Sequence, residues 1–259
     1  MKHRPRKRFG QNFLGDAAVI AAIVAAIGPA AGDTIVEIGP GTGALTRPLL
    51  NAARTLHAIE IDRDLAAALA RDFGPALHLY TEDALEFDFA RCGEALRIVG
   101  NLPYYISTPL LFHIARYAHL IRDVHVMLQR EVVERIAAAP GAANYGRLSV
   151  MLQYVFEADK LLEVPATAFH PAPDVVSAVV RLIPLGAARA RAHDESLFAQ
   201  IVASAFSQRR KTLRNSLRLW LNEDELAVAG VAPTARAQEL SVGQFVALAD
   251  LVSARTTAG

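Results

Sequence analysis

The chain has 259 residues, of which 53% are hydrophobic and 20% charged, and its net charge is +1. This composition is typical of a folded globular protein with one sizeable core and a smaller second unit. The single cysteine, Cys92, excludes an internal disulfide framework and is compatible with a reducing cytoplasm, where we expect the protein to act as a monomer.

The N-terminal region combines a basic start with an apolar run over 17–27, an outline that mimics a secretory signal. Gln11, Asn12 and Asp16 interrupt that outline, and the run is rich in alanine and too short to span a bilayer. Because Asp16 is a good N-cap, we predict an ordinary helix here and no membrane segment.

Residues 34–130 alternate short apolar runs with helical stretches such as 65–73, which predicts βαβ units. Two further runs, 150–156 and 175–182, have no long helix between them and are predicted to pair antiparallel at the sheet edge. The expected fold is therefore α/β, with a mostly parallel sheet and an antiparallel edge. The predicted parallel strands are 34–38, 56–61, 77–80, 96–99 and 124–128.

After residue 184 the pattern becomes helical, and 186–191 reads as a linker. We therefore predict one domain over 1–186 and a small all-helical domain over 187–259. Apolar positions between 197 and 221 fit one helical stripe, and a closing helix is expected over 241–252. In the first of these helices, Arg210, Arg214 and Arg218 are spaced by four and would share one face.

Ten of the 27 Lys and Arg residues fall within two short stretches, 1–8 and 209–218, that contain no Asp or Glu. Such clusters bind phosphates, although a solvated helix face and a basic tail would give the same pattern. The candidates for RNA contact are Arg4, Arg6, Lys7, Arg8, Arg209, Arg210, Lys211, Arg214 and Arg218.

A glycine-rich turn with Gly39, Gly41 and Gly43 follows the first predicted parallel strand and opens a helix. Glycine permits such a tight turn and lets a ligand approach the backbone. The G-x-G-x-G spacing differs from the G-x-G-x-x-G of dinucleotide enzymes. Since the chain also lacks a hydride-transfer site, an NAD dehydrogenase is disfavoured.

One acidic residue closes the second predicted strand and another follows the third, at the sheet edge where ligands bind in open α/β folds. Glu60 can accept from both ribose hydroxyls, and Asp83 can accept from an adenine amino group. Ile61 and Ala84 follow them and are expected in the same pocket. A single acid at a strand end is usually a solvated loop residue. Here the glycine-rich turn, Glu60 and Asp83 stand at the ends of three successive predicted strands, which favours a shared site. The eight histidines lack metal-ligand spacing, so no metal is expected.

The fourth strand leads into Asn101-Leu102-Pro103-Tyr104. An exocyclic adenine amine is a poor nucleophile because its lone pair is delocalised into the ring. If the Asn101 side-chain oxygen and the Leu102 carbonyl accept hydrogen bonds from N6, they favour a tetrahedral nitrogen whose lone pair points at a sulfonium methyl group. Pro103 would fix that carbonyl, and Tyr104 would stack on the base.

A target base must leave its stack to enter such a pocket, which therefore needs a wall on each side. The stretch 169–177 contains two prolines that stiffen a loop, and its first residue, Phe169, is the candidate for the second wall. The alternative for Phe169 is a core aromatic.

With these motifs the chain resembles the KsgA (RsmA) family of 16S ribosomal RNA adenine dimethyltransferases. The blocks that carry the resemblance are 11–14, 37–46, 60–62, 101–107 and 169–177, together with the basic stretch 206–215. The resemblance implies a Rossmann-like class I methyltransferase fold with a small helical C-terminal domain and S-adenosylmethionine as the cofactor. The implied cofactor pocket includes Gln11, Asn12, Leu14, Gly39, Glu60, Asp83 and Asn101.

The resemblance also implies a substrate: two adjacent adenines in a hairpin loop near the 3′ end of 16S ribosomal RNA, each methylated twice on the immature 30S subunit. The N-terminal basic arm would lie near the RNA. Two alternatives stay open. The first is membership of a related group of enzymes that methylate an adenine of 23S RNA and confer macrolide resistance. The second is that the chain acts mainly as an assembly factor on the small subunit.

Overall fold

The computed structural model describes residues 11–208 and 210–257, and it divides the chain into two compact units. The first unit runs to Val133 and continues over Glu157–Pro184, and the second comprises Glu134–Phe156 and the chain from Leu185 onward. The sequence predicted a single boundary near residue 186, with 134–156 in the first domain. In the structure this segment packs with the helical unit. Among the predicted RNA contacts, Arg4, Arg6, Lys7, Arg8 and Arg209 lie outside the described residues.

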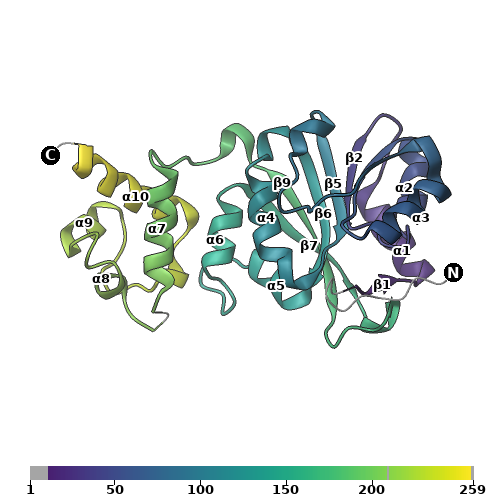
Figure 1. The fold of residues 1–259 in the computed structure, drawn as a ribbon. Helices are drawn as coiled ribbons and strands as arrows, with labels where there is room; N and C mark the ends of the chain where they lie inside the picture. The colour runs from purple at the N-terminus through teal and green to yellow at the C-terminus, as the bar shows by residue number, and fades with distance from the viewer. Residues whose placement is uncertain (1–10, 209, 258–259) are drawn as a thin grey trace. The chain divides into compact units, whose positions relative to one another are not determined.

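The first unit is built on a seven-stranded sheet in the order β4-β3-β2-β5-β6-β9-β7 (Figure 1). The strands from β4 through β6 are parallel, and β9 is antiparallel to β6, so the predicted sheet with an antiparallel edge is confirmed. The order reverses at β2, between β3 and β5, and ligands in open α/β sheets bind at such a switch point. The strands are β2 Thr34–Ile38, β3 Leu56–Ile59, β4 Leu77–Tyr80, β5 Leu96–Asn101, β6 Ile121–Gln129, β7 Phe156–Val164 and β9 Ser177–Pro184.

The predicted N-terminal helix is confirmed as α1 (Ala17–Ile27). The Asp16 carboxylate accepts hydrogen bonds from the first-turn amides of Ala18 and Val19 and so caps the helix. α1 contributes Ile23 and Ile27 to the core cluster that also holds apolar residues of α2, α3 and the central strands. The other helices of this unit are α2 Thr46–Ala53, α3 Arg63–Phe73, α4 Ser107–Ala115 and α5 Arg130–Ile136, the last of which ends in the second unit.

A second, two-stranded sheet joins segments that lie far apart in the chain. β1 (Phe13–Leu14) pairs antiparallel with β8 (Phe169–His170). The Gly15 amide extends this pairing by donating to the Ala168 carbonyl at 2.8 Å. These bonds hold the N-terminal segment against the first unit.

The second unit is helical, with its own buried core. Its helices are α6 Arg147–Gln153, α7 Glu195–Phe206, α8 Leu213–Ser216, α9 Glu223–Val228 and α10 Val242–Thr257. The predicted strand over 150–156 is wrong: most of this run forms α6, and the edge strand β7 begins at Phe156. Val150 and Tyr154 are four residues apart, and both are buried in this core, which holds Phe198 of α7 as well. A short apolar run buried in a helix has the same composition as a buried strand.

The predicted continuous helix over 197–221 is also wrong. α7 ends at Phe206, and the chain turns before the single turn of α8. The apolar spacing continues beyond α7 because Leu213 and Leu217 are fully buried in the same core. The spacing therefore reflects burial in that core and not one continuous helix. The basic residues after α7 therefore do not share one helix face. Within the described residues, no helix is long and apolar enough to cross a membrane.

Candidate active site

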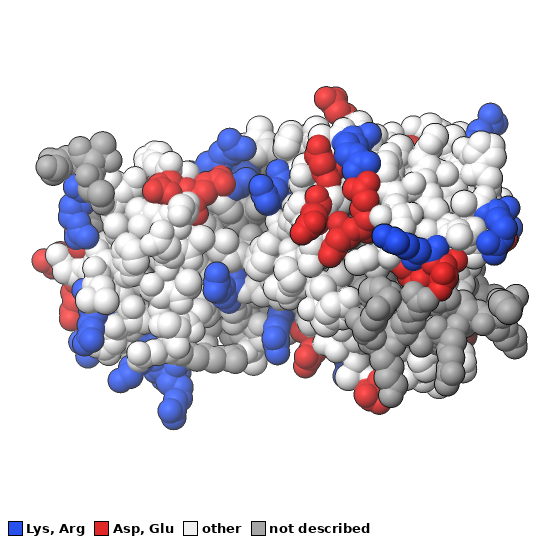
Figure 2. Space-filling model, viewed as in Figure 1, with Lys and Arg blue, Asp and Glu red and all other residues white. Residues whose placement is uncertain are grey.

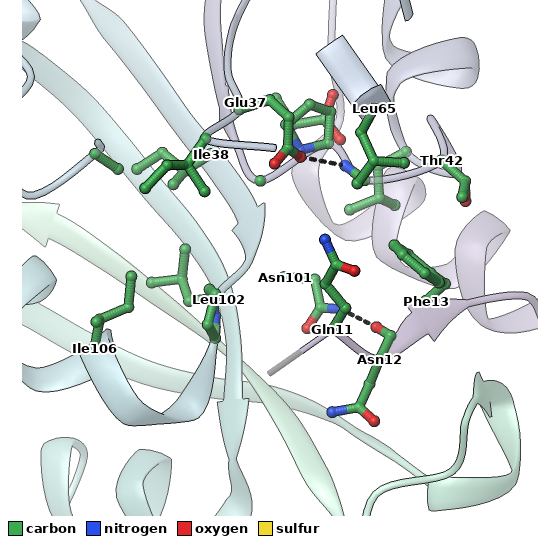
Figure 3. A pocket seen from close by; sticks show the side chains of 18 of the residues that line it. Gln11, Asn12, Phe13, Glu37, Ile38, Thr42, Leu65, Asn101, Leu102 and Ile106 are labelled. Atoms are coloured by element: carbon green, nitrogen blue, oxygen red, sulfur yellow. Dashed lines mark hydrogen bonds between the residues drawn. The ribbon is translucent and has the colours of Figure 1, made fainter. Parts of the chain in front are cut away.

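A cavity of about 330 Å³ lies at the carboxyl ends of β2, β3, β4 and β5, at the switch point of the sheet (Figure 3). The N-terminal segment before α1 forms one of its walls. Most of the residues predicted for the site line this cavity: Gln11, Asn12, Leu14, Gly39, Gly41, Glu60, Ile61, Asp83, Ala84, Asn101, Leu102, Pro103 and Tyr104. The structure therefore brings together residues that the sequence distributes over five segments.

The glycine-rich turn after β2 uses its glycines for different purposes. Gly39 and Gly41 have φ values of 66° and 59° and line the cavity, where a side chain would be strained. A Cβ atom at Gly41 would also lie 3.1 Å from the ring of Phe13. Gly43 has a φ of 84° and does not line the cavity. A Cβ atom there would lie 2.9 Å from the ring of Phe73, so Gly43 serves the packing of the turn against α3. The prediction of Gly43 as a cofactor contact is not supported.

Glu60, directly after β3, braces the glycine-rich turn. Its side chain is 5% exposed, and its two carboxylate oxygens accept from the backbone amides of Gly41, at 3.1 Å, and Asp62, at 2.9 Å. Each carboxylate oxygen has two lone pairs, so a carboxylate at this position can accept from ribose hydroxyls as well as from backbone amides. Glu60 thus connects the ends of β2 and β3 and presents a negative charge to the site.

Glu37 is a second buried carboxylate of the cavity, and no role was predicted for it from the sequence. It lies within β2, is 2% exposed and accepts a 2.7 Å hydrogen bond from the Thr46 hydroxyl. Burial, partly opposed by that hydrogen bond, and the nearby charge of Glu60 raise the pKa of Glu37 to about 7. A carboxylate inside an otherwise apolar strand is the signal that would have identified it.

The Asn101 amide is oriented by the backbone of the N-terminal segment. Its Nδ2 donates to the Asn12 carbonyl at 3.0 Å (Figure 3). A carbonyl can only accept, so this bond identifies the nitrogen, and Oδ1 is the acceptor that remains for a ligand. The Leu102 amide donates to the Met127 carbonyl of β6 at 3.2 Å, which ties the motif to the sheet. Such preorganisation suits an acceptor for an amine.

The mouth of the cavity carries an acid and an exposed aromatic ring. The Asp83 carboxylate accepts from the Leu85 amide at 2.9 Å. Tyr105 is 61% exposed, and partial burial together with the charge of Asp83 raises its pKa. Ile61 is also exposed here, which leaves an apolar surface beside Asp83 that suits a flat heterocycle.

Phe169 is not among the residues that line the cavity. Its side chain is 6% exposed and belongs to the core cluster beneath β1 and β8, where it is paired with Leu14. The prediction of Phe169 as a wall for the target base is therefore not supported, because strand pairing turns the ring into the core.

Arg210, Lys211, Arg214 and Arg218, the described members of the basic stretch 209–218, are exposed. Figure 2 shows Lys and Arg side chains over the region where Figure 1 places α8. Arg214 lies 3.7 Å from Glu223, both half-exposed, an ion pair too weak to withdraw the arginine from other partners. Within the described ranges, no group of three His, Cys, Asp or Glu side chains is arranged to hold a metal ion.

The residues of the cavity fit S-adenosylmethionine. Gly39 and Gly41 leave room beside the backbone, and the carboxylate of Glu60 complements the positive charge of that cofactor. Glu60 and Asp83 offer the acceptors that ribose and adenine require. The fold and this cavity define the class of the protein: it is a Rossmann-like methyltransferase that uses S-adenosylmethionine.

Comparison with known proteins narrows the class. A sequence model of the family described as ribosomal RNA adenine dimethylase matches residues 2–254. The chain is 56% identical to ribosomal RNA small subunit methyltransferase A of Thiobacillus denitrificans, over 98% of this chain and 100% of that protein. It is 53% identical to the protein of the same name from Aromatoleum aromaticum, over 98% and 97% of the two chains. The chain belongs to the ribosomal RNA adenine dimethylase family.

Solved structures agree with this assignment. A dimethyladenosine transferase from Plasmodium falciparum has a TM-score of 0.76 at 25% identity, covering 91% of this chain and 95% of that one. The 23S rRNA methyltransferase ErmE has a TM-score of 0.73 at 27% identity, covering 93% and 100%.

Proposed function

We propose that the protein transfers methyl groups to N6 of two adjacent adenines in the 3′-terminal hairpin loop of 16S ribosomal RNA, twice each, in the immature small subunit. Relatives that share more than half of their residues with this chain are named as small-subunit methyltransferases. Such a substrate places the protein in the cytoplasm, where we expect it to act as a monomer.

The observation that carries the chemistry is the orientation of Asn101. With Nδ2 bonded to the Asn12 carbonyl, Oδ1 accepts from the adenine N6. In the first transfer the Leu102 carbonyl accepts a hydrogen bond from the second N6–H, since Pro103 has a φ of −58° and directs the turn. Two acceptors favour a tetrahedral nitrogen, whose lone pair then points away from both of them.

The cofactor supplies an electrophilic methyl group on a sulfonium when it is bound. The protein holds the amine in line with that group, and Tyr104 stacks on the base. No strong general base is required, because the methylated amine carries a positive charge and loses its proton readily to water. Positioning is therefore the main contribution of these residues.

RNA docking is assigned to the exposed basic residues. Arg210, Lys211, Arg214 and Arg218 are exposed on the second unit and would neutralise phosphates. The basic residues within 1–8 and Arg209, which are not described, are proposed contacts on the strength of their sequence alone.

Incubation with labelled cofactor and purified ribosomal RNA particles tests the substrate. We expect label in the RNA of the small subunit, confirmed by mass spectrometry of 16S RNA from cells that lack the protein. Label found only in 23S RNA would replace this proposal with the second candidate, which the structural similarity to ErmE favours.

The variant Asn101→Ala tests the mechanism and separates catalysis from subunit binding. We expect methylation to fall by at least two orders of magnitude while salt-sensitive binding to the subunit persists. Methylation at a near wild-type rate would overturn the hydrogen-bond mechanism. If cells that carry this variant grow normally while cells without the protein do not, the main role of the protein is in subunit assembly.

A further inference from the structure

The side chain and backbone of Tyr104 are anchored by two serine hydroxyls. The Ser107 hydroxyl donates to the Tyr104 carbonyl at 2.9 Å. At the far end of the ring, the Tyr104 hydroxyl and Ser177 Oγ are 2.7 Å apart, within hydrogen-bond distance. The side chain therefore connects the 3-10 turn at Tyr104–Ile106, which follows β5, to the start of β9.

Ser177 is a rigid anchor. It is fully buried, it is the first residue of β9, and it lies opposite Gln129 in the ladder with β6. Just before it, the Arg130 amide donates to the Val176 carbonyl at 3.0 Å, which extends that ladder. A side chain held by a strand of the central sheet is positioned more accurately than one held by a loop.

Tyr104 is one of the residues that line the cavity, and its hydroxyl bonds to the fully buried Ser177. Burial, opposed by the hydrogen bond to Ser177, raises the pKa of Tyr104, so the hydroxyl is neutral at physiological pH. Such a bond adds no contact with a ligand. It restricts rotation of the ring about its side-chain torsions, and it thereby fixes the plane that faces the cavity.

We propose that Ser177 is a positioning residue for the target adenine, acting by holding the plane of the Tyr104 ring. The inference rests on the proposed function, in which Tyr104 stacks on that base. It assigns a role to the stretch 169–177 that differs from the predicted one: this stretch serves the site through Ser177, while Phe169 lies in the core.

Ser177 affects the reaction only after the target base has flipped into the cavity. RNA docks through many contacts outside the cavity, so its KM depends little on the angle of one ring. A misaligned ring lowers the fraction of bound adenine that is stacked in the reactive position, and this loss appears in kcat.

A double-mutant cycle on Tyr104→Phe and Ser177→Ala tests the proposal. One neutral hydrogen bond corresponds to about three- to tenfold, so we expect each single variant to lower kcat by this factor with little change in KM for RNA. Because both changes remove the same bond, the double variant should lose no more than either single one. Tyr104→Ala, which removes the ring itself, should lose more than either.

Three further measurements complete the test. Binding of S-adenosylmethionine by calorimetry should be unchanged, and thermal unfolding identifies any loss of the fold. Tyr117→Phe is the matched control, since it removes a tyrosine hydroxyl outside the cavity, and its kcat should equal that of the wild type. The cycle is run on whichever ribosomal RNA the wild-type protein methylates, so an error in the 16S assignment does not affect it.

Additive losses in the double variant would overturn the proposal, as would an unchanged kcat in Ser177→Ala. A folded Ser177→Ala variant whose loss lies wholly in cofactor affinity would overturn it as well.

Discussion

The buried carboxylate of Glu37 makes a quantitative prediction about stability. Its pKa is raised from 4.5 to about 7 in the folded protein, chiefly by burial. Each pKa unit corresponds to about 1.4 kcal/mol, so ionised Glu37 costs the folded state about 3 kcal/mol. We predict that Glu37→Gln, which keeps the size of the side chain and an acceptor for Thr46, removes this cost.

The sign follows from the two states. Below pH 4.5 the carboxyl is protonated in both the folded and the unfolded protein, and it contributes no pH dependence. As the pH rises from 4.5 to about 7 the unfolded state loses the proton first, so the free energy of unfolding of the wild type falls relative to that of the variant. Above about pH 7 the difference levels off at its full value.

Urea unfolding of both proteins without cofactor, followed by circular dichroism between about pH 5 and about pH 8, measures this difference. All other titrating groups are common to the two proteins and cancel. The variant should gain stability over the wild type as the pH rises, by up to about 3 kcal/mol. If the difference in the free energy of unfolding between the two proteins stays constant over this range, the pKa of Glu37 is not raised in the folded state and the prediction is wrong.

Other predictions concern the turn, its brace and the basic surface. Gly43→Ala should destabilise the fold by about 1–3 kcal/mol in urea unfolding, because the new methyl group meets an aromatic ring at 2.9 Å in a left-handed conformation. Glu60→Ala should weaken cofactor binding at least tenfold in calorimetry, since it removes the acceptor of two loop amides, and unchanged affinity would contradict the brace. Replacing Arg210, Arg214 and Arg218 with glutamine should flatten the salt dependence of RNA binding, whereas an unchanged slope would return these residues to a solvated surface.

Much of the fold was predictable because the parallel strands are short, mainly apolar runs separated by helical stretches. The strands 34–38 and 77–80 agree with β2 and β4 residue for residue. The prediction failed where one pattern serves two structures. The run 150–156 is apolar on the face that packs against α7, and periodicity over so few residues does not separate helix from strand.

The site was predictable where residues act from strand ends, since topology brings those ends together. Gly39, Glu60, Asp83 and Asn101 are examples. Roles that depend on which way a side chain turns were not predictable. Phe169 enters the core because of its pairing with β1, and Ser177 reaches Tyr104 across the sheet, a contact between residues 73 positions apart.

The pairing of β1 with β8 also bears on how the protein is made. The segment that forms one wall of the cavity leaves the ribosome first, but its partner strand at residues 169–170 is synthesised only after roughly two-thirds of the chain. Until then the early segment has no ladder to join, and contacts of such large sequence separation form late. A nascent chain should therefore acquire its ability to retain the cofactor abruptly, once β8 has emerged, rather than strand by strand.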